Sequence, residues 1–284
     1  MRTLIFGGAG MLGRALVAEA RSRKFAALAL PRGQAAGRAR DRLLYWAETF
    51  RPELVVNCAA FTKVDACESE PERAAEVNGR AVAHVADAAR QAGARLIQLS
   101  TDYVFDGRAS EPYTEAFPPA PLSVYGRSKL AGETAALAAP RSLVVRTSWL
   151  FGPGGPNFVA TIVRKIAEGA RRLEVVEDQV GCPTYTPFLA RAVLDLAPLA
   201  LDGVVHYRNR EPVSWYAFAD EIARLWASDV EVVPVATAQV PRPALRPAYS
   251  VLDVSRFEQA LRRRVEPWGW GLVEYLTALR RGRG

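Results

Sequence analysis

The stretch TLIFGGAGMLG, residues 3–13, decides the fold of this chain. A short apolar run is followed at once by glycines at positions 7, 10 and 13, and then by an alanine-rich helical pattern. Glycines allow the backbone to turn tightly and to approach a pyrophosphate, whose charge is then held by amide groups at a helix N-terminus. A plain turn would also use glycines, but the position between strand and helix favours a dinucleotide site at Gly7, Gly10 and Gly13.

Apolar segments of strand length recur through the first half of the chain, with helical patterns between them. Strands are expected at residues 3–6, 26–30, 54–57, 96–100 and 143–146. Helices are expected at residues 11–22, 41–50, 79–92 and 123–138. This alternation predicts an α/β fold with a Rossmann-type, doubly wound parallel sheet.

The texture of the chain changes after Trp149, where glycine, proline and short elements take over. We expect a helix near residues 158–169, a strand near 174–176, and further lobe segments at 214–226 and 241–247. Residues 203–207 look like a strand that returns to the main sheet. The sequence therefore predicts a nucleotide-binding domain at residues 1–150 and a smaller, discontinuous substrate lobe within residues 151–284.

Composition and charge limit the classes of function. Half of the 284 residues are hydrophobic, and 37 basic side chains exceed 30 acidic ones to give a formal charge of +7. The basic residues are spread along the chain among acidic neighbours, which favours a small anionic substrate over nucleic acid. No apolar run of membrane-spanning length and no cleavable leader are present, so we expect a soluble, cytoplasmic protein without a membrane partner.

Cysteine and histidine usage predicts neither disulfides nor a metal site. Cys58, Cys67 and Cys182 are scattered and lack C-x-x-C spacing. His84 and His206 are isolated as well. We therefore expect no catalytic metal.

Tyr125 and Lys129 are four residues apart, so on a helix the phenol and the ammonium share one face. A nearby ammonium stabilises a phenolate and lowers the tyrosine pKa, which makes the phenol a better proton donor for a carbonyl reduction. The same spacing is also common on solvated helix faces. Thr101 and Asp102 follow the expected fourth strand, where open α/β sheets bind ligands.

Together, Thr101, Tyr125 and Lys129 resemble the Thr/Ser-Tyr-Lys triad of the extended short-chain dehydrogenase/reductase family. Further stretches resemble sugar-nucleotide reductases of that family, and the resemblance spans almost the whole chain. These stretches are residues 55–62, 64–65, 68–70, 125–133, 146–149, 178–184, 214–216, 246–247 and 250–253.

The resemblance implies that hydride from a nicotinamide reduces the C4 ketone of a dTDP-linked 4-keto-6-deoxy sugar. It makes Tyr125 the acid, has Lys129 also hold the nicotinamide ribose, and has Thr101 orient the carbonyl. It places Asp102 and Trp149 at the sugar, where an indole face suits an apolar ring side. It places the cofactor against Met11, Leu12, Ala60, Phe61, Thr62 and Leu99.

Two departures from the family pattern concern the cofactor and a metal. Arg32 stands where an acidic residue would bind the ribose 2′-hydroxyl of NADH, so NADPH is favoured and NADH stays open, with Arg14 as a second contact for a 2′-phosphate. Some family members are Mg²⁺-linked dimers, but Ala15 replaces one carboxylate, so a homodimer is left open and no metal is expected. Arg246 is the preferred contact for the diphosphate, because arginine binds phosphate oxygens bidentately.

Four other functions share parts of this pattern. A sugar-nucleotide dehydratase would need a glutamate base where this chain has Tyr103, and an epimerase that recycles NAD would more naturally keep an acidic ribose ligand. A non-catalytic NADP-binding subunit, like the regulatory subunit of methionine adenosyltransferase, resembles the same family, but the retained triad argues against it. Reduction of another keto-sugar nucleotide also stays open.

Overall fold

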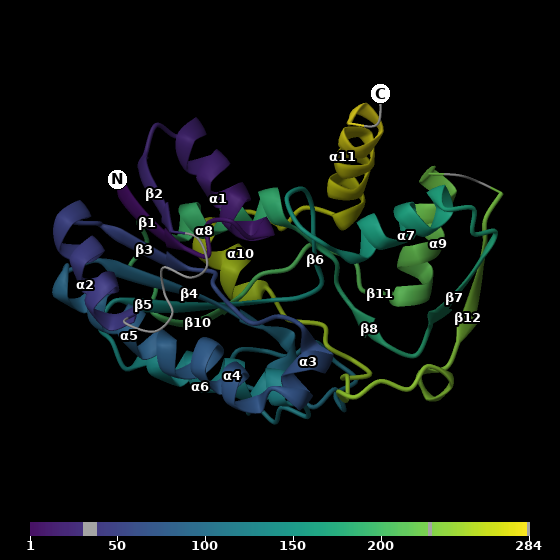
Figure 1. Ribbon diagram of the computed structural model, residues 1–284, viewed down its shortest axis with the longest axis horizontal. Helices are drawn as coiled ribbons and strands as arrows, with labels where there is room; N and C mark the ends of the chain where they lie inside the picture. The colour runs from purple at the N-terminus through teal and green to yellow at the C-terminus, as the bar shows by residue number, and fades with distance from the viewer. Residues whose placement is uncertain (31–38, 227–228, 283–284) are drawn as a thin grey trace.

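The computed structural model describes residues 1–30, 39–226 and 229–282. Its centre is a six-stranded sheet in which all neighbouring strands run parallel, in the order β10-β5-β4-β3-β1-β2. The expected doubly wound parallel sheet is therefore confirmed, as Figure 1 shows. The six strands are β1 (Arg2–Phe6), β2 (Ala26–Leu30), β3 (Leu54–Asn57), β4 (Arg95–Thr101), β5 (Ser142–Thr147) and β10 (Gly203–His206).

Helices cover both faces of this sheet (Figure 1). On one face α1 (Met11–Ser22) packs against α8 (Thr186–Leu196), around a core that includes Leu16, Ile97 and Leu189. The other face carries α2 (Ala39–Phe50), α5 (Ala81–Gln91) and α6 (Val124–Leu137). Because both faces are covered, the central strands β3, β4 and β5 are buried throughout.

The ligand crevice of such a sheet lies where the strand order reverses, at the carboxyl ends of the strands. Here the order reverses between β1 and β3. Gly7 has a φ of +80°, and a Cβ added there would come within 2.6 Å of the Ala59 amide nitrogen. The loops after β1 and β3 are therefore in close contact, and glycine is required at this point.

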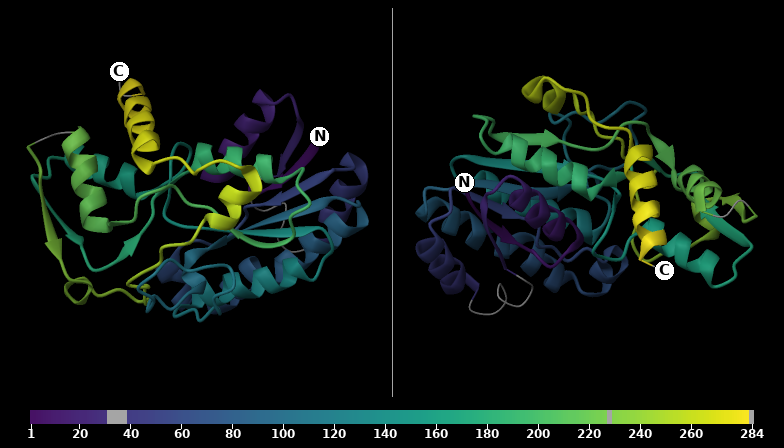
Figure 2. Two further views of the ribbon diagram at one scale, coloured as in Figure 1. Left: turned by 180° about the vertical axis from the view of Figure 1, so that it is seen from behind. Right: turned by 90° about the horizontal axis from the view of Figure 1, so that it is seen from above.

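The second half of the chain forms several small units beside the main sheet, seen also from behind and above in Figure 2. Helices α7 (Phe158–Ala167) and α9 (Trp215–Trp226) pack together, and α9 covers a parallel pair of β7 (Arg172–Val176) and β12 (Glu231–Val235). Two more pairs are β6 (Leu150–Phe151) with β9 (Thr184–Tyr185), and β8 (Val180–Gly181) with β11 (Val213–Ser214). The last helices are α10 (Ser255–Leu261) and α11 (Trp268–Arg281).

Residues 151–284 contribute to both parts of the molecule. Strand β10 pairs with β5 in the main sheet, and α10 packs against β10. Helix α8 likewise packs on α1. The division near residue 150 therefore stays a prediction, although the expected return of the chain to the sheet is observed at β10.

The helix expected at residues 79–92 has a different N-terminal part. Short helices α3 (Val64–Ser69) and α4 (Pro71–Ala75) lead into a π-helical turn, η1 (Glu76–Arg80), which precedes α5. The turn packs on α6, where a Cβ on Gly132 would lie 2.1 Å from the Asn78 carbonyl oxygen. The wider turn carries the buried Asn78 side chain, so its geometry follows from packing and not from local propensity.

Candidate active site

Helix α6 carries Tyr125 and Lys129 on one face, beside the end of β4. The helix starts at a capping residue, Ser123, whose hydroxyl accepts a hydrogen bond from the Gly126 amide at 3.1 Å. The Glu68 carboxylate of α3 accepts a hydrogen bond from the Val124 amide at 2.8 Å. A Cβ on Gly126 would lie 2.2 Å from the Tyr103 carbonyl oxygen, so glycine lets the first turn of α6 approach the strand end closely.

Lys129 is buried at the bottom of the site, with 4% of its surface exposed. Its Nζ donates a hydrogen bond to the Leu99 carbonyl oxygen at 2.7 Å. Burial lowers the pKa of Lys129 to about 8, an effect that the charge of Glu133 opposes. The ammonium therefore titrates close to neutral pH, where a small change in its surroundings alters its charge.

Tyr125 is half-buried, and burial raises its pKa above the usual value. The nearby Thr101 hydroxyl opposes this shift. We expected the Lys129 ammonium to lower the Tyr125 pKa, and that expectation is wrong for this state. The ammonium is directed at the Leu99 carbonyl, and removal of the phenol from water has the larger effect.

Thr101 and Asp102 lie at the end of β4 and are both buried. The Thr101 hydroxyl donates to Asp102 Oδ1 at 3.0 Å and accepts from the Tyr103 amide at 3.3 Å. Asp102 Oδ2 has no hydrogen-bond partner among the described residues. Burial raises the pKa of Asp102 to about 6, and nearby Ser250 and Thr101 hydroxyls offset this only in part. Thr101 would have to turn from Asp102 to donate to a substrate carbonyl.

The start of α1 suits a pyrophosphate. Its N-cap Gly10 makes no side-chain cap, and its first turn has no acidic residue, so helix amides are left for an anion. A Cβ on Gly13 would lie 2.2 Å from the Gly7 carbonyl oxygen, which explains that glycine. Met11 and Leu12 form the first positions of the helix, as a backbone cradle requires.

The loop after β3, which holds Ala60, Phe61 and Thr62, is fastened to α6 through Asn78. The Asn78 side chain accepts from the Phe61 amide at 2.7 Å and donates to the Phe61 carbonyl at 3.0 Å. It also donates to Ser128 Oγ at 3.0 Å. The sequence pattern did not single out Asn78, because its role depends on the π-helical turn.

Trp149 follows β5 and has an unusual backbone, with a φ of +45°. Its ring stacks on Trp215, with centroids 3.5 Å apart and an interplanar angle of 6°. A Cβ on Gly181 would lie 2.5 Å from Trp149 Cε2. The indole is therefore held between α9 and β8, while its contact with a sugar stays a prediction. A strained, non-glycine φ is typical of functional positions.

Arg246 is joined to the nucleotide-binding half of the chain through Asp65. Its Nη1 and Nη2 donate to the two Asp65 carboxylate oxygens at 3.1 and 2.9 Å. The Arg246 side chain is 13% exposed, whereas that of Arg242, 3.7 Å from the same carboxylate, is 54% exposed. The diphosphate contact of Arg246 stays a prediction, and its guanidinium is already paired.

The remaining sequence predictions concern Arg32, a metal site and a membrane span. Arg32 lies outside the described residues. In the described part of the chain, no three His, Cys, Asp or Glu side chains are grouped to hold a metal ion. Nowhere in that part does a helix have the length and apolar character needed to span a bilayer.

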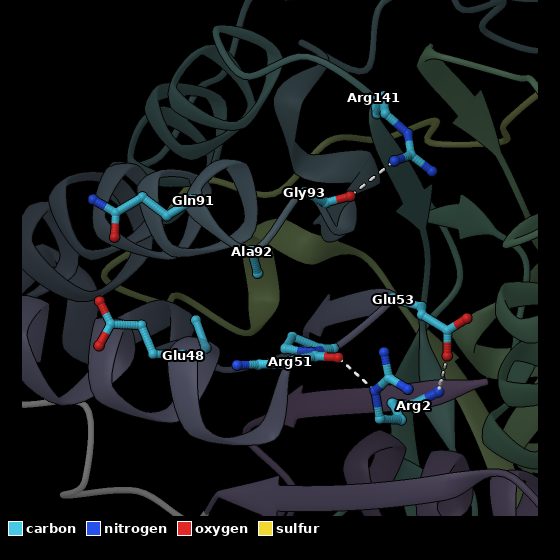
Figure 3. Close-up of a pocket in the computed structure, with 10 residues that line it drawn as sticks. Arg2, Glu48, Arg51, Glu53, Gln91, Ala92, Gly93 and Arg141 are labelled. Atoms are coloured by element: carbon cyan, nitrogen blue, oxygen red, sulfur yellow. Dashed lines mark hydrogen bonds between the residues drawn. The ribbon is translucent and has the colours of Figure 1, made fainter.

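A hollow of about 630 Å³ lies at the opposite, amino edge of the sheet (Figure 3). Arg2 Nε donates to the Arg51 carbonyl at 2.6 Å, and Arg141 Nη1 to the Gly93 carbonyl at 2.8 Å. These arginines therefore satisfy carbonyl groups just beyond the ends of α2 and α5. Their arrangement is explained by helix termination.

Comparison with known proteins agrees with this geometry. The family model described as "RmlD substrate binding domain" matches residues 1–281. A dTDP-4-dehydrorhamnose reductase of Streptomyces griseus is 43% identical over 286 residues, which cover 98% of this chain and 94% of the relative. The chain belongs to the dTDP-4-dehydrorhamnose reductase family.

Two further members of this reductase group bear on cofactor and substrate. A crystal structure of dTDP-4-dehydrorhamnose reductase from Bacillus anthracis in complex with NADP has a TM-score of 0.93 and 33% identity, covering 98% of this chain and 99% of that chain. A probable dTDP-4,6-dihydroxy-2-methyloxan-3-one 4-ketoreductase of Streptomyces antibioticus is 41% identical over 261 residues, or 90% of this chain and 88% of the relative. The names of these two relatives specify different keto sugars.

Proposed function

We propose that this protein reduces the C4 ketone of dTDP-4-dehydro-L-rhamnose with NADPH and so forms dTDP-L-rhamnose, the last step of dTDP-rhamnose synthesis. The observation that carries the proposal is that Tyr125 lies near Thr101 at the carboxyl edge of the sheet, one helical turn from Lys129, whose ammonium bonds the Leu99 carbonyl of β4. Family membership supports the sugar nucleotide, and the NADP complex of the Bacillus anthracis relative supports the cofactor. We place the activity in the cytoplasm and leave open whether the protein is a homodimer.

Tyr125 is the proton donor in this proposal. When bound, the nicotinamide supplies hydride to the sugar, and the alkoxide that grows at C4 takes the phenolic proton. The Thr101 hydroxyl, which reaches the phenol, orients the carbonyl and stabilises the same oxygen. The Lys129 ammonium holds the ribose hydroxyls and balances the phenolate charge after the transfer.

The remaining residues hold the two ligands. The amides at Met11 and Leu12 take the pyrophosphate beside Gly10, whose own amide donates to the Gly7 carbonyl, and the loop of Ala60–Thr62 with Leu99 lines the nicotinamide side. On the substrate side, Trp149 presents its indole to the deoxysugar, while Asp102 binds a sugar hydroxyl. Arg246 stays our candidate for the diphosphate, together with the more exposed Arg242.

A reductase of another keto-sugar nucleotide is the second candidate. The similarity to the Streptomyces antibioticus ketoreductase favours it, because that relative matches 90% of this chain. The two functions share the mechanism and differ only in the sugar. They are separated by turnover with several dTDP-4-keto sugars.

The test is stoichiometric. Purified protein, NADPH and dTDP-4-dehydro-L-rhamnose should consume one cofactor per sugar and yield a 4-hydroxy product that NMR identifies as dTDP-L-rhamnose. Tight NADP binding without turnover of any dTDP-4-keto sugar would indicate the non-catalytic alternative. Faster turnover of a different keto sugar would leave the mechanism standing and overturn the substrate assignment. Comparison of kcat/KM for NADPH and NADH, in the wild type and in Arg32→Ala, tests the cofactor preference.

A further inference from the structure

A row of three polar side chains crosses the sheet just behind the catalytic residues. Ser100 of β4 is in register with Arg146 of β5, and Arg146 is in register with His206 of β10. Residues in register on neighbouring parallel strands point to the same face. They are 6%, 3% and 0% exposed, respectively, so this polar row is buried within the sheet.

Glu133 of α6 closes this row from above. Its Oε1 accepts from Ser100 Oγ at 2.5 Å and from Arg146 Nε at 2.9 Å, and its Oε2 accepts from Arg146 Nη2 at 2.7 Å. Arg146 also contacts His206 Nε2 at 3.4 Å and lies over the Phe105 ring, with Cζ 5.1 Å from the centroid. Glu133 is 2% exposed, so both charges of the pair are removed from water.

Such a pair is a poor way to stabilise a core. Desolvation of two ions offsets much of their attraction, and apolar side chains of similar volume are often as stable or more so. The pair therefore calls for a role other than stability. The position of the pair indicates such a role: Glu133 shares a helix face with Lys129, and its partner Ser100 immediately precedes Thr101.

Glu133 adjoins the triad on two sides. On α6 it follows Lys129 by four residues, so the carboxylate and the ammonium share a helix face. On β4 its partner Ser100 immediately precedes Thr101. One carboxylate thus fixes the catalytic helix to the strand that carries the third triad member.

We infer that Glu133 is a positioning residue of the reductase: it fixes α6 against β4 through Ser100 and against β5 through Arg146, and it supplies the negative charge that holds the Lys129 ammonium. This inference rests on the proposed function, because it assigns Glu133 a part in the same reaction. Arg146 completes the unit by holding the carboxylate in one orientation with two hydrogen bonds.

The groups around Lys129 leave Glu133 as its main source of negative charge. The Cys58 thiol faces it from the end of β3, but burial raises the pKa of Cys58 to about 12, so the thiol stays neutral. Tyr125 on α6 also stays neutral, because its pKa is raised. Burial lowers the pKa of His206 to about 3, so the imidazole on β10 does not titrate near neutral pH. Asp102, after β4, has a pKa of about 6 and is charged above it.

Glu133→Gln tests the inference through pH dependence. Loss of a charge one helical turn away should lower the pKa of Lys129 by roughly one unit or more. The basic limb of kcat should move down by the same amount, so that activity falls strongly at pH 8.5 and changes much less at pH 6. A merely structural role would reduce kcat equally at all pH values.

A direct measurement does not depend on turnover. The chain has four lysines, Lys24, Lys63, Lys129 and Lys165, so an NMR titration of protein with ¹⁵Nζ-labelled lysine gives few signals. Lys129→Met assigns the Lys129 signal by removing it. The Lys129 midpoint should fall in Glu133→Gln, while the other three midpoints stay as in the wild type.

Two further variants separate charge from structure. Ser100→Ala keeps both charges and removes one hydrogen bond between α6 and β4, so kcat should fall a few-fold with the basic limb unchanged. In Glu133→Gln the buried Arg146 guanidinium is left without its carboxylate, and this charge could unfold the variant or repel Lys129. The double variant Glu133→Gln/Arg146→Met removes that charge as well. The double variant should fold, and it should keep the lowered basic limb of kcat and the lowered Lys129 titration midpoint. Wild-type midpoint and limb in the double variant would overturn the inference.

These outcomes are distinct from failure of the proposed function. If the wild type reduces no dTDP-4-keto sugar, the proposed function fails, and the Lys129 titration still reports on Glu133. If the wild type is active and Glu133 does not affect the titration, the function stands and the inference is wrong.

Discussion

The residues that we assign to proton transfer and those that we assign to the sugar nucleotide are held in different ways. Thr101 and Lys129 belong to the buried strand β4 and to the inner face of α6, which are joined by the Leu99 carbonyl and by the Glu133 network. Trp149 and Arg246 are instead held by single side-chain partners far away in sequence, Trp215 and Asp65. A shift of Thr101 or Lys129 would require a shift of the sheet, whereas Trp149 and Arg246 can each be repositioned by a change in one partner.

This difference has a physical consequence. A hydroxyl that must donate a proton needs its position fixed to within a fraction of an ångström, and a buried sheet and helix provide that. A sugar pocket needs shape and can vary between relatives while the chemistry stays constant. Variants in the first region should therefore change kcat, and variants in the second should change KM.

Tyr125→Phe should give the largest effect on activity. Loss of the phenolic proton should lower kcat by about 100-fold or more, the usual size of a general-acid contribution. Cofactor binding, followed by NADPH fluorescence, should change little because the ring and the Lys129 contact remain. A variant with wild-type kcat and pH dependence would remove Tyr125 from the chemistry and with it the division between the two regions.

Asp102→Asn tests the boundary between the regions through stability. The pKa of Asp102 is raised from 3.8 to about 6 in the folded state. The wild type therefore has its full stability below pH 3.8, the pKa in the unfolded chain, and loses stability as pH rises through 6. The variant removes that cost, so it should be more stable by up to about 3 kcal/mol above pH 7 and similar to the wild type near pH 4. Chemical denaturation at both pH values measures this. A constant difference across pH would mean that Asp102 does not titrate as argued.

Gly181→Ala probes the substrate side without touching the proposed chemistry. The added Cβ would lie 2.5 Å from Trp149 Cε2, so the indole must shift. We expect KM for the sugar nucleotide to rise roughly tenfold, as for loss of one aromatic contact, with kcat nearly unchanged. Gly269→Ala is a control for glycine replacement, since a Cβ added at Gly269 meets no atom within 4 Å. A fall in kcat with unchanged KM would contradict the division of roles.

Asp65→Asn should give the smallest effect. A partly exposed ion pair contributes about 1 kcal/mol or less, so KM for the sugar nucleotide should rise about threefold as Arg246 loses its orientation. Asp229→Asn, which breaks an exposed pair with Arg171 near the start of β12, serves as the matched control. A lower KM in Asp65→Asn would mean that the carboxylate competes with the diphosphate for Arg246.

Local patterns predicted most of the main sheet. The apolar run 26–30 and the helix 11–22 coincide with β2 and α1, because a strand–glycine–helix unit depends on neighbours in sequence. Tyr125 and Lys129 could be placed together for the same reason, since both lie on α6, and their catalytic role stays a prediction. The π-helical turn at Asn78 could not, because it arises from contact with α6.

The sequence by itself determined the parallel α/β fold, the glycine cradle and the two α6 residues that face β4, since each depends on short-range periodicity and on backbone chemistry. Only the tertiary structure decided that Glu133 meets Ser100 and Arg146, that Trp149 stacks on Trp215, and that Arg246 is paired with Asp65. These contacts join segments up to 181 positions apart. Long-range contacts of this kind also set the pKa values of the buried groups, because burial and the nearest charge are properties of the folded chain and not of its local sequence.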